Sequence, residues 1–218
     1  MKVLITAGST MTPIDRVRGI NNIFRGKTGL QIARYFHSRG ADVTLLLASD
    51  LYKSLRQLPN FPCKTFRTFD QLERLMAHEI KSRGYDTVIH SAAVNDYELA
   101  QVSVLHGKRF IPVKNNGKIS SKHKRIRLEL VQTIKIIDQI RRPWGFPGKL
   151  VKFKLEVGIS DRELVEIARE SMNHSGADMI VANCLEWYKE RAYIIEGNGF
   201  CMGISRNALA PELYRRLK

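Results

Sequence analysis

The segment GINNIFRGKTG, residues 19–29, ends in residues that could bind a nucleotide phosphate. Residues 26–28, Gly-Lys-Thr, repeat the tail of a P-loop, in which backbone N–H groups and a lysine hold phosphates. The full pattern, G-x-x-x-x-G-K-S/T, places its first glycine at position 21, which is Asn21 here. Gly19 is two positions too early. The spacing therefore argues against a P-loop.

The loop before Lys27 is long enough for a different kind of phosphate site. Some 18 residues separate an apolar run that ends at Gly8 from the helix expected at Lys27, which is too long for the short turn of a GxGxxG dinucleotide fingerprint. Such a loop can still present N–H groups, Arg25 and Lys27 to a phosphate at a helix N-terminus. The alternative is that Gly26 and Gly29 only permit close packing.

Two further segments could contact a ligand. Small residues in SAAVNDYE, residues 91–98, would let a ligand approach the backbone at a strand end, where Asn95, Asp96 and Tyr97 offer polar and stacking groups. A generic turn is the alternative. Residues 114–127, KNNGKISSKHKRIR, contain six Lys or Arg residues and no acidic residue. They form a solvated basic loop, a phosphate clamp or a nucleic-acid patch.

The elements that position these segments follow an alternating strand and helix pattern. In the first half, we expect strands at 2–8, 41–49 and 85–94 and helices at 27–39 and 70–83. Residues 99–121 break the rhythm and predict a long excursion with extended pieces. The pattern then resumes with strands at 125–130, 149–157 and 177–183, helices at 134–142 and 161–174, a hairpin at 192–204, and a C-terminal helix capped by Ser205.

This order predicts an α/β fold, a Rossmann-like, doubly wound and mostly parallel sheet with a long excursion and a C-terminal hairpin. No internal repeat or linker divides the chain, so we expect a single domain over residues 1–218. In such sheets ligands bind beyond the carboxyl ends of the strands. All three candidate segments fall at such ends or in the excursion.

Composition and charge narrow the function classes. Apolar residues make up 44% of the chain, but no run is long enough for a membrane helix, and three distant cysteines favour a reducing cytoplasm over a disulfide framework. The six histidines lack metal-site spacing, and His90, inside an apolar strand, is expected to be a core residue with a hydrogen-bond partner. The net charge of +15 favours anionic ligands, although a solvated basic surface is the alternative.

Taken in order, five motifs resemble the phosphopantothenoylcysteine synthetase family, the ligase of coenzyme A synthesis. The motifs are KVLITAGSTMTPIDRVRGINN, SAAVNDYE, GKISS, VKFKLEVG and ADMIVANCL, and they span almost the whole chain. The chain is most similar to the monofunctional form of the family, which has no decarboxylase domain.

The resemblance implies an amide ligation in two steps. The carboxylate of 4′-phosphopantothenate attacks the α-phosphorus of a nucleoside triphosphate, with CTP favoured over ATP, and the amine of cysteine then displaces the nucleotide. Mg²⁺ is the implied metal cofactor, although the sequence does not identify its ligands. A homodimer is implied because a neighbouring subunit completes the phosphopantothenate site in this family.

Carried over position by position, the resemblance implies two catalytic residues, Asn22 at the acyl-nucleotide intermediate and Lys118 on the loop that reaches the triphosphate. The nucleotide-binding residues that it implies, together with Arg25 from the helix start, are Gly8, Ser9, Thr10, Gly26, Lys27, Ala92, Ala93, Asp96 and Phe153.

Some positions depart from the family pattern. Phe24 and Arg25 replace two hydroxyl residues, Lys152 replaces a glycine and Cys184 replaces an aspartate. One alternative is therefore a catalytically impaired homologue that binds nucleotide or an acidic partner. Another is a nucleic-acid-binding module that uses residues 114–127, but that stretch lacks the interleaved aromatic residues on which bases stack.

Overall fold

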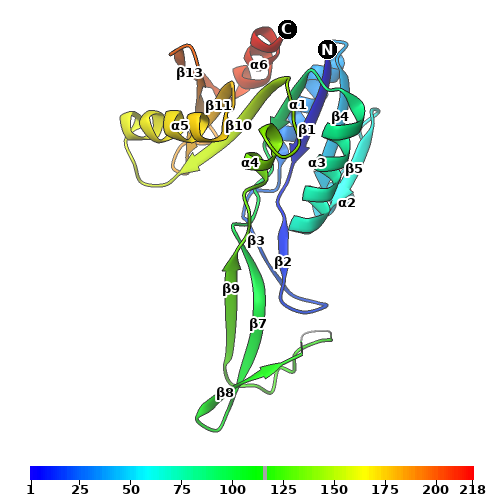
Figure 1. Ribbon diagram of the computed structural model, residues 1–218, viewed down its shortest axis with the longest axis vertical. Coiled ribbons are helices and arrows are strands. Elements are labelled where there is room, and N and C mark those ends of the chain that lie inside the picture. Colours follow the sequence, from blue (N-terminus) through cyan, green and yellow to red (C-terminus); the bar gives the residue numbers. More distant parts are fainter. Residues whose placement is uncertain (115–116) are drawn as a thin grey trace.

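An eight-stranded sheet runs through the body of the protein in the computed structural model, which describes residues 1–114 and 117–218 (Figure 1). The strand order is β5 (Cys63–Phe66), β4 (Asp42–Ala48), β1 (Lys2–Ala7), β6 (Thr87–His90), β10 (Lys149–Glu156), β11 (Met179–Cys184), β12 (Arg191–Glu196) and β13 (Cys201–Ser205). The strands from β5 to β11 are parallel, whereas β12 and β13 form an antiparallel hairpin. The predicted doubly wound, mostly parallel sheet with a C-terminal hairpin is confirmed.

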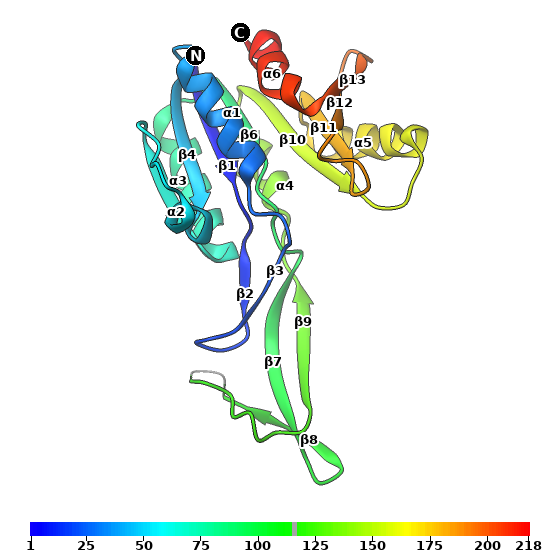
Figure 2. The ribbon, with the colours of Figure 1, turned by 180° about the vertical axis from the view of Figure 1, so that it is seen from behind.

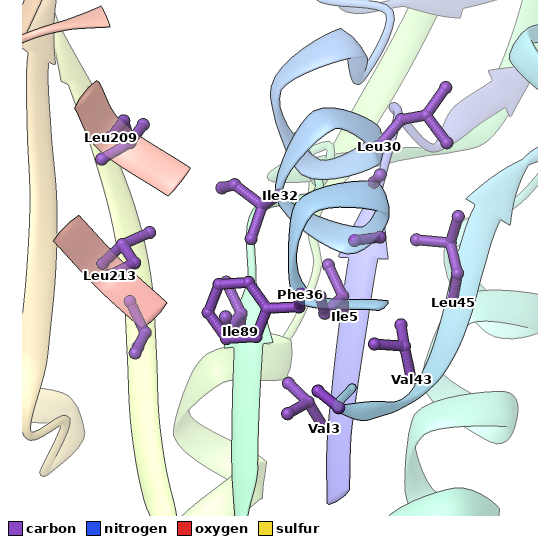
Figure 3. Close-up of a cluster of buried hydrophobic side chains, with 14 of the residues drawn as sticks. Val3, Ile5, Leu30, Ile32, Phe36, Val43, Leu45, Ile89, Leu209 and Leu213 are labelled. Carbon is purple, nitrogen blue, oxygen red and sulfur yellow. The ribbon is translucent and has the colours of Figure 1, made fainter. Parts of the chain in front are cut away.

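Helices cover both faces of this sheet. On one face lie α1 (Lys27–Ser38), α2 (Ser49–Ser54) and α6 (Leu209–Leu217), and on the other lie α3 (Phe69–Arg83), α4 (Ile136–Arg141) and α5 (Asp161–Ser175). Figure 3 shows Phe36 of α1 and Leu213 of α6 in one apolar cluster with side chains of the strands beneath. Phe36 is fully buried, and burial of a side chain of this size contributes about 1.5–3 kcal/mol.

Local sequence explains where several helices begin and end. Thr68 and Ser160 each start a capping box, with Gln71 and Glu163 at the third helical position of α3 and α5. Ser205 stands at the start of the short 3₁₀ helix η1 (Arg206–Ala208), but its side chain makes no capping hydrogen bond. The position of this predicted cap is thus correct, although its hydrogen bond does not form.

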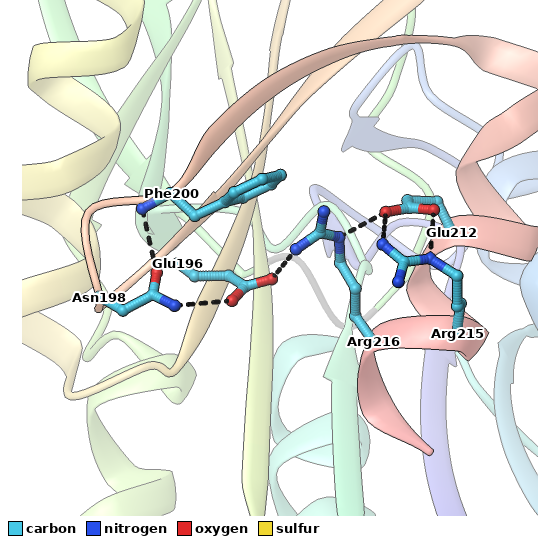
Figure 4. A network of polar contacts seen from close by, with 6 residues as sticks. All are labelled: Glu196, Asn198, Phe200, Glu212, Arg215 and Arg216. Carbon is cyan, nitrogen blue, oxygen red and sulfur yellow. Dashed lines mark hydrogen bonds and ion pairs between the residues drawn. The ribbon is translucent and has the colours of Figure 1, made fainter.

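A polar network fastens the C-terminal helix to the hairpin (Figure 4). Arg216 of α6 lies 2.5 Å from Glu196 of β12 and 2.6 Å from Glu212, which also pairs with Arg215. The guanidinium of Arg216 also stacks on the ring of Phe200 at 3.7 Å. These contacts fix the segment that leads from β13 into α6.

A three-stranded antiparallel sheet forms an arm that projects from the body (Figures 1 and 2). Its central strand is β7 (Tyr97–His106), which pairs with β8 (Arg109–Val113) and β9 (Ile126–Gln132). The sequence predicted that the strand at 125–130 returns to the main sheet. This was wrong, because that strand belongs to the arm and strand propensity does not specify a partner. Residues 115–116 of the excursion lie outside the described residues.

The long loop between β1 and α1 also contains structure that the sequence did not reveal. β2 (Met11–Pro13) and β3 (Gly19–Asn21) form a small hairpin within it. The hydroxyl of Thr12 donates to the carbonyl of Tyr97 at 2.9 Å, which attaches this hairpin to β7 of the arm. Across the described part of the chain, no helix is both long enough and apolar enough to cross a membrane.

Candidate functional site

Most of the candidate nucleotide-binding residues lie around the ends of β1 and β6, the region called the crevice here. From β1 the chain builds outward to β4 and β5 and then returns to β6 on the other side of β1, which is the switch point where such sheets bind ligands. The loops after the two strands run side by side. Ala93 N–H donates to the Gly8 carbonyl at 2.8 Å, and Thr10 N–H donates to the Ala93 carbonyl at 3.2 Å. The structure thus brings residues 8–10 together with 92–93.

Glycines bring the start of α1 onto the end of β1. Gly26, the residue before α1, has a φ of 86°, and a Cβ there would lie 2.0 Å from the backbone nitrogen of Gly8. A Cβ on Gly29 would lie 2.3 Å from the Ser91 hydroxyl oxygen. These glycines are required for close packing, and that packing directs the N-terminus of α1 into the crevice.

The first turn of α1 is suited to an anion. It contains no acidic residue, and Gly26 provides no side-chain cap for the free N–H groups of this turn. Arg25 and Lys27 flank Gly26 and are exposed, and neither forms an ion pair with any described residue. The free N–H groups, the helix dipole and the two side-chain cations all favour a phosphate here.

Asn22 lies at the same crevice. Its amide group donates to Oδ1 of Asn95 at 2.8 Å and to the Ala93 carbonyl at 3.4 Å. Ser9 is held nearby, because its hydroxyl donates to Oδ1 of Asn21 at 2.6 Å. The Nδ2 group of Asn22 is therefore occupied by protein oxygens, which directs its Oδ1 atom elsewhere.

The sequence named Asn95 as a polar group for a ligand, but its hydrogen bonds show that it positions neighbouring residues. Its backbone N–H donates to the Thr10 hydroxyl at 2.8 Å, and its side chain donates to the Thr12 hydroxyl at 2.9 Å. Its carbonyl accepts the Thr133 hydroxyl at 3.0 Å. Asn95 thus joins β2, Asn22 and the end of β9. The only sequence signal was its place in SAAVNDYE, next to Asp96.

His90 supports the crevice from below and is a core residue with a partner, as the sequence predicted. Its Nδ1 atom lies 2.9 Å from the Thr6 hydroxyl, which also accepts the Ala92 N–H at 3.1 Å. Burial lowers the pKa of the His90 imidazole to about 4, and the positive charge of Lys152 on the neighbouring strand acts in the same direction. His90 is therefore neutral near neutral pH.

The loop that carries Lys118 docks on the turn of the β2–β3 hairpin. The carboxylate of Asp15 accepts the Ile119 N–H at 3.1 Å, and the guanidinium of Arg18 donates to the Ile119 carbonyl at 2.8 Å. The Gly117 carbonyl accepts the Arg16 N–H at 3.1 Å. Two N–H groups of the Arg18 guanidinium donate to Oδ2 of Asp15 and hold the pKa of the Asp15 carboxyl well below its usual range, although burial opposes this effect.

Lys118 and Asn22 are not brought together within one chain. The neighbours of Lys118 contact residues 15–18 at the turn of the hairpin, whereas Asn22 follows β3 at the base of the hairpin. Figures 1 and 2 show this turn pointing along the arm, away from α1. Asp15 and Arg18 lie within the first of the five motifs. Nothing in the sequence identified them as the residues that hold this loop.

The residues that depart from the family pattern have clear positions. The ring of Phe24 packs edge-on against that of Tyr188, with 5.1 Å between the ring centroids. Lys152 is buried beneath α5, where its ammonium group donates to the hydroxyls of Ser171 and Ser175. Phe153, the next residue on β10, packs on the opposite face with the α1 cluster, beside the crevice.

The crevice offers one carboxylate for a metal ion among its candidate residues. Asp96 is exposed, and its backbone carbonyl is fixed by the Thr133 N–H at 2.9 Å. No cluster of three or more metal-ligating side chains occurs in the described ranges. Mg²⁺ is usually held by one or two carboxylates together with substrate phosphates. Asp96 therefore fits a magnesium ion that arrives with a nucleotide.

A family model and two curated relatives match most of this chain. Residues 1–199 match the family model described as the DNA/pantothenate metabolism flavoprotein C-terminal domain. The coenzyme A biosynthesis bifunctional protein CoaBC of Thermococcus kodakarensis is 32% identical over 212 residues, which cover 94% of this chain and 47% of that protein. The CoaBC protein of Methanocaldococcus jannaschii is 29% identical over 84% of this chain and 40% of its own length. The chain thus spans about half the length of these curated relatives.

Several solved structures share the fold. The DNA/pantothenate metabolism flavoprotein from Streptococcus pneumoniae has a TM-score of 0.84 and 31% identity, with 100% of this chain and 98% of that chain covered. A Cab2 mutant in complex with phosphopantothenate-cysteine has a TM-score of 0.74 over 99% of this chain and 86% of that chain. Its identity of 16% shows a likeness of fold alone. The chain therefore belongs to the DNA/pantothenate metabolism flavoprotein C-terminal domain family, which confirms the resemblance read from its motifs.

Proposed function

We propose that this chain is a nucleotide-dependent ligase that joins 4′-phosphopantothenate to cysteine and gives 4′-phosphopantothenoylcysteine, with CTP favoured over ATP. The observation that carries this proposal is the convergence of Asn22, the N-terminus of α1 and the loops after β1 and β6 at one crevice, in a chain of this family. The names of its relatives refer to coenzyme A biosynthesis, which supports this substrate class.

In the first step a carboxylate oxygen of 4′-phosphopantothenate attacks the α-phosphorus, and pyrophosphate leaves with its bonding electrons. In the second step the cysteine amine attacks the acyl carbon and loses a proton, and the nucleoside monophosphate leaves. The N–H groups of α1, Arg25 and Lys27 stabilise the phosphate charge. Oδ1 of Asn22, which the Asn95 contact leaves for the ligand, orients the acyl-nucleotide.

Gly8, Ser9, Thr10, Ala92 and Ala93 line the nucleotide, and Phe153 lies beside its base. Asp96 contacts the nucleotide and, in this proposal, holds Mg²⁺, which neutralises phosphate charge when it is bound. Lys118 contacts the triphosphate.

A second copy of the chain completes the site in this proposal. Large apolar side chains are exposed on and near the arm, at Tyr97, Ile126, Leu130, Val131 and Ile134. Exposed apolar clusters of this kind mark interaction surfaces. A homodimer that buries the arm would also allow Lys118 of one chain to reach Asn22 of another. We place this enzyme in the cytoplasm, where its three free cysteines stay reduced.

Two other functions make different predictions. The Phe24–Tyr188 contact favours an impaired homologue as the second candidate, because it replaces a hydroxyl that would face the phosphates. A nucleic-acid module is disfavoured, because residues 114–127 contain no aromatic residue on which a base could stack.

A pyrophosphate-release assay with 4′-phosphopantothenate, cysteine, Mg²⁺ and either CTP or ATP tests the proposal. We expect release that requires 4′-phosphopantothenate, with CTP the better nucleotide. Nucleotide binding without turnover would favour the impaired homologue. Salt-sensitive binding of unrelated DNA without turnover would favour the nucleic-acid module.

A further inference from the structure

Arg206, in the C-terminal segment, reaches across the sheet to the candidate site. One terminal nitrogen of its guanidinium donates to Oδ1 of Asn183, at the end of β11, at 3.0 Å. The other donates to the hydroxyl of Thr28, in the first turn of α1. Its backbone N–H donates to the Glu190 carbonyl at 2.7 Å. Arg206 therefore links the end of β11 to the start of α1, over the end of β10.

The charge of Arg206 is not balanced in this position. Among the described residues no carboxylate lies within ion-pair distance of its guanidinium, and both of its side-chain partners are neutral oxygens. Burial lowers the pKa of the Arg206 guanidinium. A cation beside a helix N-terminus is also unfavourable, because the helix dipole places positive partial charge there. An anion bound at the start of α1 would offset both costs.

The hydrogen-bond partners of Arg206 lie next to residues proposed to bind the nucleotide. Thr28 follows Lys27 directly, and Asn183 donates to the Lys154 carbonyl, one residue beyond Phe153. Arg206 and Thr28 both line a groove of about 310 Å³ between α1 and the segment of η1 and α6, so the start of α1 is next to an open space.

We propose that Arg206 binds the β- and γ-phosphates of the nucleoside triphosphate, with Thr28 and Asn183 holding its guanidinium in place when no nucleotide is bound. This inference rests on the proposed function, because it takes the ligand of the crevice to be a nucleoside triphosphate. Arginine suits this role because its planar guanidinium matches a phosphate with two parallel hydrogen bonds.

The test compares nucleotides that differ only in their phosphates. Titration calorimetry measures the Kd of CTP and of CMP for the wild-type protein and the variants R206Q and R206K, with R162Q as the control. Arg162 is mostly exposed, with 89% of its side-chain surface accessible, and among the described residues it pairs with Glu166 alone, so R162Q removes the same charge from α5 instead.

We expect R206Q to weaken CTP binding about tenfold or more and CMP binding less than twofold. R206K, which keeps the charge, should recover part of the loss, and R162Q should match the wild type. Equal weakening of CTP and CMP, or unchanged CTP binding in R206Q, would overturn the inference. If R206Q fails to fold, R206K is compared with the wild type in its place. CTP binding that weakens more than CMP binding supports the inference, and equal changes for the two nucleotides overturn it.

These results separate the two proposals. If R206Q loses CTP binding but not CMP binding, while the wild-type protein releases no pyrophosphate, the ligase proposal is contradicted and the role of Arg206 stands. A ligase whose KM for CTP is the same in R206Q and the wild type would contradict only the role of Arg206. Wild-type protein that binds no nucleotide would overturn both.

Discussion

The side-chain amide of Asn22 donates to Oδ1 of Asn95 at 2.8 Å and so links the loop before α1 to the loop after β6. The same Asn95 side chain donates to Thr12 at 2.9 Å and to the Ile20 carbonyl at 3.3 Å. Asn95 thus fixes both the position of Asn22 and the hairpin that precedes it. The orientation of the proposed catalytic amide depends on this neighbour.

The first prediction concerns Asn95→Ala. The change leaves Asn22 without its oriented partner, and misplaced reacting groups can slow catalysis about 100-fold. We expect kcat to fall by about tenfold to 100-fold while the KM for nucleotide changes little, because the start of α1 is untouched. Steady-state pyrophosphate release measures both constants. An unchanged kcat in a folded variant would show that Asn95 does not position Asn22.

The second prediction concerns the separation of Asn22 and Lys118 at opposite ends of the β2–β3 hairpin. We expect the variants N22A and K118A each to lose nearly all activity. When they are mixed and allowed to exchange subunits, about a quarter of wild-type activity should return, because half of the dimers then contain one intact site. Mixed variants that remain inactive although their subunits exchange would place both residues in the same chain's site.

The third prediction concerns Asp15, which accepts hydrogen bonds from Ile119 and pairs with Arg18. Asp15→Asn removes the charge that holds Arg18 and should release the loop around Lys118. Trypsin should then cleave between residues 118 and 127 several-fold faster, since local opening controls proteolysis. Asp161→Asn, which breaks the Arg191 pair elsewhere, is the matched control. Equal cleavage rates in D15N and D161N would refute this role.

The fourth prediction follows from the buried imidazole of His90. Its pKa is about 4 in the folded protein and about 6.5 when unfolded. As the pH falls through this window, the unfolded state binds a proton that the folded state does not, so stability decreases. The loss approaches about 3 kcal/mol near pH 4. Urea unfolding should show this extra loss in the wild type but not in His90→Gln, and identical pH profiles would contradict it.

The sequence predicted the body of the fold well, because its signals are local. The buried runs of β1, β4 and β11 and the helical spacing in α1 each lie within one short segment. The arm was harder, since β9 is mostly exposed and nothing in its residues identifies β7 as its partner. The short β5 and α2 were missed for a similar lack of periodic signal.

Gly8 and Gly26 lie in two motifs that the sequence pointed out, and the structure brings them together. Their backbones approach closely because neither residue has a side chain that would separate them. The roles of Asp15, Asn95 and Arg206 could not be found in this way, because their partners are distant in the sequence: Asp15 and Ile119 are 104 residues apart, and Arg206 and Thr28 are 178 apart. The roles of Asn22 and Lys118 stay predictions.

The central claim is that a carboxylate oxygen of 4′-phosphopantothenate attacks the α-phosphorus of the nucleotide. Mass spectrometry of the products formed from carboxyl-¹⁸O-labelled 4′-phosphopantothenate, cysteine and CTP tests this claim most directly. We predict that one labelled oxygen appears in CMP and none appears in pyrophosphate. Product formed with unlabelled CMP, or label found in pyrophosphate or in inorganic phosphate, would contradict the acyl-nucleotide mechanism.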